Sequence, residues 1–489
     1  MKRILAFLLF LVVLSGSLIA CVGGETSTEE STNPNTETKD GGDSGSTSET
    51  EPEDVLKLLE KQDYDGYEFI FYTRECCNHA NNLYAEAEAN DAVSVANYNR
   101  NLKVQEYLNI EIVEPITAPD GNCVTLIDAL QADDDVCDAI HWHFKFLGEM
   151  ATTGLLRKMS DLPYFSFEED WWATDLIENY SIAGNVYVAQ GEYCSDTVTD
   201  MGCLAFNRRI QRDSLSDVDF FQLVRDHEWT LDKMITYAKQ IGEDSNKDSV
   251  IDENDTFGFN TSAQHLFQFM YSSNQHTTAK NEDGIPELVL NTEKMYDLVE
   301  KVYGLICDNP YTYCPEMNNI HIFTEGRALF SSYCFYDITY EITRDMEDGF
   351  GILPYPKYDE SQEEYYSRMI SHASLLGLPY NLEQPERSAH IMEALAREGY
   401  QTVRPAIYET ALKTKYTDTD SWEMMDIIMA GSTSDFADIY DNFNLAYTLD
   451  TLIGRHKWDD FGSFYAMYES IEITTLQKAI DKLTAIDNE

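Results

Sequence analysis

The sequence has little basic charge and lacks the short patterns that mark several enzyme classes. Its 489 residues include 34 lysines and arginines against 87 aspartates and glutamates, for a net charge of −53. Affinity for nucleic acid comes largely from Lys and Arg contacts to phosphates, so a nucleic-acid partner is excluded. The part of the chain that can fold has no H-E-x-x-H, Walker or G-x-S-x-G pattern, and nothing local indicates an enzyme. The acidic excess fits the solubility of an exported protein.

Cysteine patterns typical of zinc sites are also missing. None of the ten cysteines forms C-x-x-C or a zinc-ribbon spacing. Nine remain besides Cys21, so at least one is not paired within the chain. In an oxidising location, disulfides can join Cys194 to Cys203 or Cys307 to Cys314. In an anaerobic habitat the same thiols stay reduced and are buried as small apolar side chains.

A long apolar run occurs at the N-terminus. Lys2 and Arg3 precede an unbroken run over residues 4–14, followed by small residues and then Leu18-Ile19-Ala20-Cys21. This pattern is typical of an export signal, and the run is too short to span a bilayer permanently. The end of the segment resembles the bacterial lipoprotein box. That resemblance implies cleavage after Ala20, lipidation of Cys21 by thioether and palmitate chains, and a lipid-anchored protein on the extracellular face of the cell membrane.

Residues 1–20 are therefore the predicted signal peptide, and residues 21–54 the predicted tether. The tether consists of Ser, Thr, Glu, Gly and Asn with almost nothing apolar, so it cannot bury a core and is expected to be disordered. A flexible coil of this length reaches roughly 30 Å. The remaining part exceeds the usual size of a single core, which predicts two lobes.

Strands and helices alternate after the tether. Residues 67–72 predict a buried strand, residues 91–108 a helix, and residues 109–113 and 136–142 further strands. This alternation predicts a parallel sheet that is covered on both faces.

Several phrases in a fixed order carry a family resemblance. The chain resembles the extracellular solute-binding proteins of ABC importers, class II, a group that includes maltose-binding protein. The match extends over residues 66–430 and is less clear at the C-terminus. The phrases are Asn99-Arg100-Asn101 with Val104 to Ile110, Gly184 to Tyr187 followed by Phe206-Asn207-Arg208, Glu228 to Met234, Phe323 to Phe330, and Gly351 to Lys357.

The resemblance implies an α/β fold of the bilobal periplasmic-binding-protein-like type II, with two α/β lobes joined by a hinge. It implies a first lobe made of residues 55–188 and 322–400. The second lobe would contain residues 189–321 and a helical C-terminal part, 401–489. Ligand would bind between the lobes, beyond the carboxyl ends of strands.

Carbohydrate is the expected cargo. Aromatic side chains cover the apolar face of a sugar ring, while charged side chains bind its rim of hydroxyls. Trp172 and Trp229 fit the core better, and His141 with His143 suits a metal but lacks an evident third ligand. The predicted ligand-binding residues, most of them at strand ends, are Arg74, Glu75, His141, Trp142, Trp171, Glu192, Tyr193, Tyr333, Asp337 and His372.

The segment from Asp244 to Asp255 predicts a structural calcium site. It follows the spacing of a calcium loop, with Ser249 in place of the usual Gly and Asp255 in place of the final Glu. The alternative is a solvated acidic loop, and no other cofactor is expected. The predicted ligands are Asp244, Asn246, Asp248, Val250 through its carbonyl, Asp252 and Asp255.

Together these features predict a monomeric, non-enzymatic receptor that closes on a carbohydrate, in particular an oligosaccharide, by hinge motion. It would deliver this cargo to the transmembrane subunits of an ABC-type permease. Two alternatives stay open. One is a non-sugar solute such as a peptide, and the other is a secreted glycoside hydrolase, for which two carboxylates at a set separation suffice.

Overall fold

The computed structural model describes residues 54–75, 82–87, 90–118, 123–316, 320–338, 346, 348–370, 373–415, 419–440 and 445–485. The predicted signal peptide, Cys21, His372 and nearly all of the tether lie outside the described residues. Within the described part, none of the helices combines the length and the apolar content needed to cross a bilayer.

A four-stranded mixed sheet has the order β14-β5-β2-β4. β2 runs parallel to both β4 and β5, whereas β14, from much later in the chain, runs antiparallel to β5. A separate parallel pair is formed by β1 and β3. The bounds are β1 Tyr67–Phe69, β2 Phe71–Arg74, β3 Ile110–Ile112, β4 Ile116–Ala118, β5 Ala139–His143 and β14 Ser374–Gly377.

The strand predicted over residues 67–72 is two strands that belong to different sheets. The break falls at Ile70, whose amide donates to the Asp138 carboxylate at 2.9 Å. The Asp138 amide in turn donates to the Ile70 carbonyl, and Tyr67 donates its hydroxyl to the same carboxylate. These bonds replace the ladder bonds that would continue a strand, so a distant Asp decides where β1 ends.

A five-stranded mixed sheet has the order β10-β7-β11-β6-β12. β11 is parallel to β7 and antiparallel to β6, and all of its residues are buried. The assignment of residues 322–400 to the first lobe is therefore wrong for β11 and β12, since the chain rejoins the first sheet only at β14. The bounds are β6 Gly202–Asn207, β7 Phe257–Asn260, β10 Thr312–Tyr313, β11 Ala328–Cys334 and β12 Phe350–Leu353.

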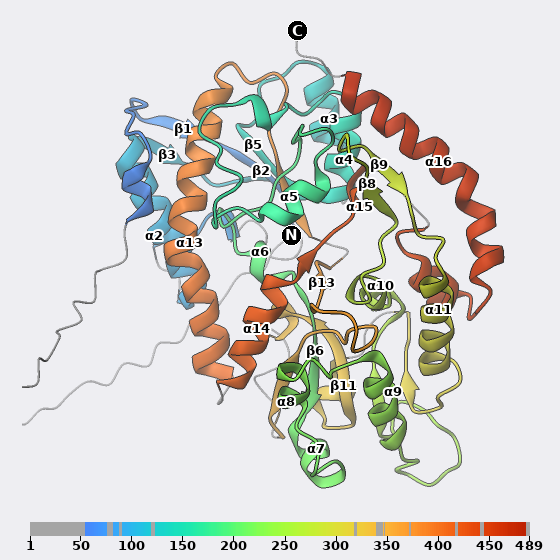
Figure 1. The fold of residues 1–489 in the computed structure, drawn as a ribbon. Helices are drawn as coiled ribbons and strands as arrows, with labels where there is room; N and C mark the ends of the chain where they lie inside the picture. The colour runs from blue at the N-terminus through green and yellow to red at the C-terminus, as the bar shows by residue number, and fades with distance from the viewer. Residues whose placement is uncertain are drawn as a thin grey trace, which may run out of the picture. The chain divides into compact units, whose positions relative to one another are not determined.

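Helices surround both sheets (Figure 1). Asp91 caps α2, and Thr292 caps α11. The bounds are α2 Ala92–Leu108, α3 Val124–Gln131, α4 Phe144–Thr152, α5 Thr174–Tyr180, α6 Asp196–Thr199, α7 Arg208–Ser214, α8 Phe220–Arg225, α9 Leu231–Gln240, α10 Phe267–Ser272, α11 Glu293–Ile306, α12 Ile320–Thr324, α13 Pro385–Lys415, α14 Asp420–Ala430, α15 Phe436–Tyr440 and α16 Phe461–Ala485.

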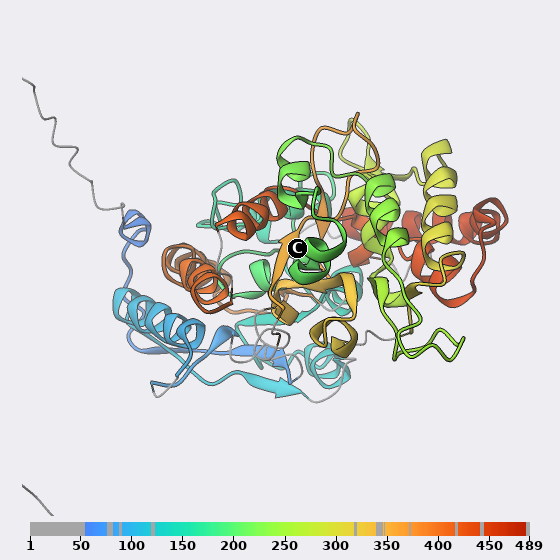
Figure 2. The ribbon, with the colours of Figure 1, turned by 90° about the horizontal axis from the view of Figure 1, so that it is seen from below.

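Helix α13 is continuous where the sequence predicted a crossing near Tyr400. It packs along α2, and Figure 2 shows the two helices side by side at one end of the described part, with α11 and α16 at the other. Two small pairs complete the fold, an antiparallel β8–β9 hairpin and a parallel β13–β15 pair. Their bounds are β8 Thr278–Lys280, β9 Pro286–Leu288, β13 Ser367–Arg368 and β15 Ser432–Thr433.

The two sheets share apolar packing. Trp142 of β5 and Cys203 of β6 belong to one contiguous buried cluster. Neither of the disulfides that the sequence allows is formed, because Cys194, Cys203, Cys307 and Cys314 are free thiols. Burial raises the pKa of the Cys194 and Cys203 thiols well above the ordinary value, so these side chains act as small apolar groups.

A glycine allows α4 and α15 to pack backbone to backbone. A Cβ added at Gly148 would lie 1.6 Å from the carbonyl oxygen of Ile439. No side chain can relieve such a contact, because the atom it meets is backbone. The position of α15, and of the polar side chains that it carries, therefore depends on the absence of a side chain at residue 148.

We expect Gly148→Ala to destabilise the protein by about 3 kcal/mol, because α15 must move away from α4. Gly304 in α11 is the matched control, since a Cβ there meets nothing within 4 Å. Gly304→Ala should be neutral or stabilise by up to about 1 kcal/mol through helix propensity. Urea unfolding of both variants measures the difference, and equal stabilities would show that α4 and α15 do not pack this closely.

Candidate functional site

One chain segment runs between the two sheets and brings polar side chains with it. At its start, Ala189 pairs with Leu376 of β14, and at its end Met201 pairs with Met369. The Ile370 amide also donates to the Asp200 carbonyl at 2.9 Å. Residues 190–201 therefore lie between the edge of the first sheet and the beginning of β6. We call them the crossing segment.

Polar side chains from the ends of strands in both sheets meet the crossing segment. We call this group the strand-end cluster, and it consists of Arg74, His141, Tyr193, Asp196, Asp200 and Asp337. His141 is fully buried, and its two ring nitrogens lie 2.9 Å from the Tyr193 hydroxyl and from the Asp196 carboxylate. Asn82 donates to the other oxygen of Asp196. Hydrogen bonding therefore fixes the His141 ring from both sides.

The carboxylates of the cluster repel one another in a dry environment. Burial raises the pKa of Asp200 well above its usual value, and the negative charges of Asp196 and Asp337 add to this, while Arg74 opposes it. One oxygen of Asp200 is buried without a hydrogen-bond partner among the described residues. Arg74 donates to the Ser374 hydroxyl at 3.1 Å. The cluster thus contains Asp200, which in its protonated form can donate or accept a hydrogen bond, close to the charged Arg74.

The structure brings together only some of the predicted ligand residues. Arg74, His141, Tyr193 and Asp337 belong to the strand-end cluster, where the Asp337 carboxylate accepts the Cys334 amide. Tyr333 belongs to the same strand as Cys334, and it is buried with its ring against Phe323.

Three other predicted ligand residues lie elsewhere. Glu75 is exposed, because it follows the last residue of β2. Trp142 is fully buried and packs against Tyr72 in the core. The indole of Trp171 donates to Glu393 of α13 and is covered by Arg397, so it joins α13 to the loop that precedes α5. Trp229 belongs to the core, as its position suggested.

His141 and His143 do not form a metal pair, in keeping with the lack of an evident third ligand in the sequence. The His143 ring accepts the Lys145 amide and lies against Phe144, whereas His141 bonds to Asp196. A strand alternates its side chains, but the chain turns into α4 immediately after His143, which directs this ring away. His141, Cys194 and Asp196 approach one another more closely, yet both ring nitrogens of His141 are already hydrogen-bonded.

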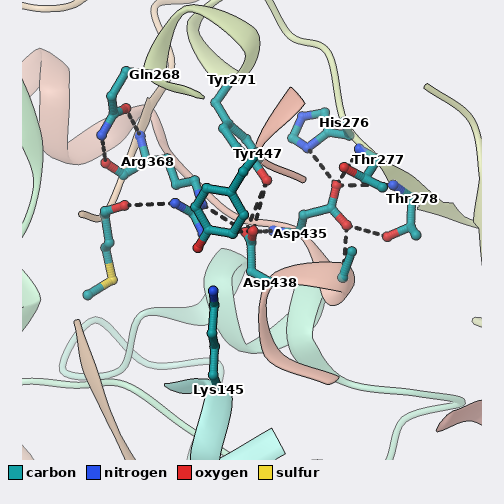
Figure 3. A network of polar contacts seen from close by, with 12 residues as sticks. Lys145, Gln268, Tyr271, His276, Thr277, Thr278, Arg368, Asp435, Asp438 and Tyr447 are labelled. Atoms are coloured by element: carbon teal, nitrogen blue, oxygen red, sulfur yellow. Dashed lines mark hydrogen bonds and ion pairs between the residues drawn. The ribbon is translucent and has the colours of Figure 1, made fainter. Parts of the chain in front are cut away.

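A second buried network adjoins the cluster and was not predicted (Figure 3). Arg368 of β13 pairs with Asp438 of α15 at 2.7 Å, and the Tyr271 hydroxyl donates to the same carboxylate. The Arg368 guanidinium also lies over the rings of Tyr271 and Tyr447. Lys145, at the start of α4, points its ammonium toward the Tyr447 ring at 4.5 Å. No spacing signals this group, because its members lie up to about 300 residues apart.

Glu192 lines a separate cavity of about 460 Å³ on the other side of the crossing segment. Its side chain is buried, with one oxygen 3.5 Å from Arg404 and the other without a partner in the described part of the chain. Burial raises the pKa of Glu192 to about 7, and the Arg404 charge opposes the rise. Trp172, Tyr400 and three exposed aspartates, Asp170, Asp175 and Asp426, line the mouth.

The predicted calcium loop forms a turn in which side-chain oxygens accept hydrogen bonds from the loop's own amides. Asp255 is fully buried and accepts the amides of Ser245 and Asp252 at 2.8 and 2.9 Å. Ser249 adopts φ 66°, the left-handed conformation that usually requires Gly at this loop position. One Asp244 oxygen is buried without a partner among the described residues. The loop therefore holds the donor types of a calcium site, although no three of its carboxylates lie within 4.8 Å of one another in the described structure.

Comparison with solved structures identifies the fold. UgpB from Mycobacterium tuberculosis in complex with glycerophosphocholine matches with a TM-score of 0.55 at 13% identity, over 86% of this chain and 99% of that one. A cyclo/maltodextrin-binding protein complexed with maltotetraose matches with a TM-score of 0.51 at 11% identity, over 86% of this chain and 98% of that one. An ABC-transporter solute-binding protein from Thermotoga lettingae, bound to α-D-tagatose, matches with a TM-score of 0.51 at 11% identity, over 85% of this chain and 100% of that one. No protein-family model and no curated protein sequence matches the chain.

The raised pKa of Glu192 predicts a pH dependence of stability. A carboxyl with a folded pKa above the unfolded one contributes stability that is present below about pH 4.5 and is lost as pH rises through about 7. Glu192→Gln stays neutral, so between pH 5 and pH 8 the wild type should lose about 3 kcal/mol relative to this variant. Urea unfolding at both pH values tests this, with the exposed Glu75→Gln as control. Parallel curves for wild type and Glu192→Gln would refute it.

Proposed function

We propose that this chain, whose fold is that of the maltose-binding-protein-like solute-binding proteins, is an extracellular receptor that binds a carbohydrate without converting it. The observation that carries the proposal is the strand-end cluster. Its side chains come from the carboxyl ends of β2 and β11, from β5 and from the crossing segment. Ligands of open α/β sheets bind at this edge.

The chemistry of the cluster suits hydroxyl groups. A carboxylate accepts from a sugar hydroxyl, a guanidinium donates to one, and a neutral acid such as Asp200 can do either. Aromatic rings that could cover a sugar face are those of Tyr193, within the cluster, and of Tyr447, beside Arg368 in the second network. Two of the structural relatives were solved with maltotetraose and with α-D-tagatose, which supports a saccharide, and we propose an oligosaccharide as the cargo.

Closure and delivery complete the proposal. Because the crossing segment joins the first sheet to the second, small backbone rotations in it would move the two sheets relative to each other. We propose that the closed, loaded receptor hands its cargo to the transmembrane subunits of an ABC-type permease. The predicted export signal and Cys21 support a monomer held on the extracellular face of the cell membrane by its lipid.

Glycerophosphocholine bound to a relative makes a non-sugar solute the second candidate. The buried Arg368 and the partly buried Lys145 favour it, since a phosphate requires cationic donors. A glycoside hydrolase would also need two carboxylates beside a bound sugar, and it would release product.

Saccharide binding should raise the melting temperature by mass action and leave the ligand intact. We expect Asp200→Asn to weaken the affinity of the best saccharide by about tenfold, because a buried partner of a hydroxyl is changed. Asp175→Asn, in the separate cavity, is the matched control. A thermal-shift screen with maltodextrins and glycerophosphocholine, followed by calorimetry and product analysis, measures this. No response to any saccharide would reject the cargo, and product would reject the receptor.

We also propose that Asp244, Asn246, Asp248, Val250, Asp252 and Asp255 hold a structural calcium ion. Calorimetric titration of the chelator-stripped protein should give a dissociation constant of about 10⁻⁴–10⁻³ M, since the final ligand is a short Asp. Asp248→Asn should weaken binding, whereas Asp283→Asn, an exposed turn residue, should not. Absence of binding at millimolar calcium would remove the site.

A further inference from the structure

Three lysines converge on one small pocket in a chain where basic residues are scarce. The pocket has a volume of about 260 Å³ and lies between α4, α15 and α16. Its polar lining consists of Lys145, Glu149, Thr152, Thr475, Lys478 and Lys482. The chain has 34 basic residues against 87 acidic ones, yet the polar lining here has three ammonium groups and one carboxylate.

Helix geometry explains the convergence. Lys145, Glu149 and Thr152 follow one another at spacings of four and three on α4, so they share one face of that helix. Thr475, Lys478 and Lys482 do the same on α16. The close approach of α4 and α15 at Gly148 brings Ile439 and Tyr440 beside this face, where they form the apolar part of the lining.

The lysines have no carboxylate partner of their own. Among the described residues, none of the three forms an ion pair or a hydrogen bond through its ammonium group, and the Lys145 ammonium lies over the face of the Tyr447 ring. Burial lowers the pKa of Lys145, and the nearby Arg368 charge lowers it further, while Asp438 and Asp450 oppose the change. The ammonium of Lys145 is therefore incompletely compensated.

Donors to a bound group come from these lysines and from the Tyr440 hydroxyl, which is buried without a hydrogen-bond partner among the described residues. The hydroxyls of Thr152 and Thr475 donate to carbonyls of their own helices, those of Glu149 and Ile471. The overall charge of −53 does not prevent an anion from binding, since charges more than about 8 Å away are largely screened at physiological ionic strength. Whether an anion binds in this pocket therefore depends on the local excess of positive charge.

We propose that this pocket binds a small oxyanionic group, a carboxylate, sulfate or phosphate, through Lys145, Lys478 and Lys482. Its size lies at the lower end of small-molecule sites, which suits a free anion or the acidic group of a larger solute. The pocket is distinct from the strand-end cluster, so the proposal does not rest on the cargo assigned there.

Calorimetry at low salt tests the proposal with four probes: inorganic phosphate, sulfate, glucuronate and glucose. Phosphate or sulfate should bind, and added sodium chloride should weaken the binding. Lys478→Gln and Lys482→Gln should each raise the dissociation constant about three- to fivefold, as expected for partly exposed charges. Both positions are exposed on α16, so the fold should persist. Lys239→Gln, an exposed lysine of α9, is the matched control and should change nothing.

The four probes distinguish a free anion from the acidic group of a larger solute. Binding of phosphate or sulfate without glucuronate indicates a free oxyanion, while glucuronate binding that exceeds glucose binding and depends on Lys478 indicates an acidic sugar. Absence of binding of all three anions at about 10 mM overturns the proposal. Binding that Lys478→Gln and Lys482→Gln leave unchanged, or that Lys239→Gln weakens equally, overturns it as well.

Discussion

The burial of charged side chains between the two sheets is the constraint on which the rest of the structure depends. A charge taken out of water costs several kcal/mol unless it is paired and hydrogen-bonded. Arg368 therefore requires Asp438, and Arg74 requires the polar groups around Ser374 and Asp200. The polar ring of His141 likewise requires its hydrogen bonds to Asp196 and Tyr193. Each pair joins segments that are far apart in the chain. The pairs can therefore form only when the chain follows its native path.

Two buried acids are not compensated in this way. The pKa of Asp200 is raised by burial and by neighbouring carboxylates, and the pKa of Glu192 is raised to about 7 by burial with a cation at 3.5 Å. Such groups reduce stability at neutral pH, and buried acids with perturbed pKa values gather at functional sites. Both belong to the crossing segment, so a change in that segment would alter the surroundings of both.

Local signals were read correctly where a physical rule acts over a few residues. The helix predicted over residues 91–108 is α2, which begins at Ala92 where the Asp91 side chain accepts the Ser94 amide. Strand-end reasoning brought Arg74, His141, Tyr193 and Asp337 to one place, because side chains at the ends of neighbouring strands meet. It failed for Trp142, since alternation along β5 turns this residue into the core, and for β11, since an apolar strand does not specify its sheet.

The sequence by itself determined the α/β class, the start of α2 and the acidic character, because these follow from composition and from contacts within about one helical turn. Only the tertiary structure decided that β11 and β12 pair with β6, that Asp138 interrupts the first strand, and that Arg368, Asp438 and Lys145 meet. These depend on pairings between residues tens to hundreds of positions apart. These contacts are stabilised by hydrogen bonds and ion pairs that form away from water, and no local sequence pattern encodes them.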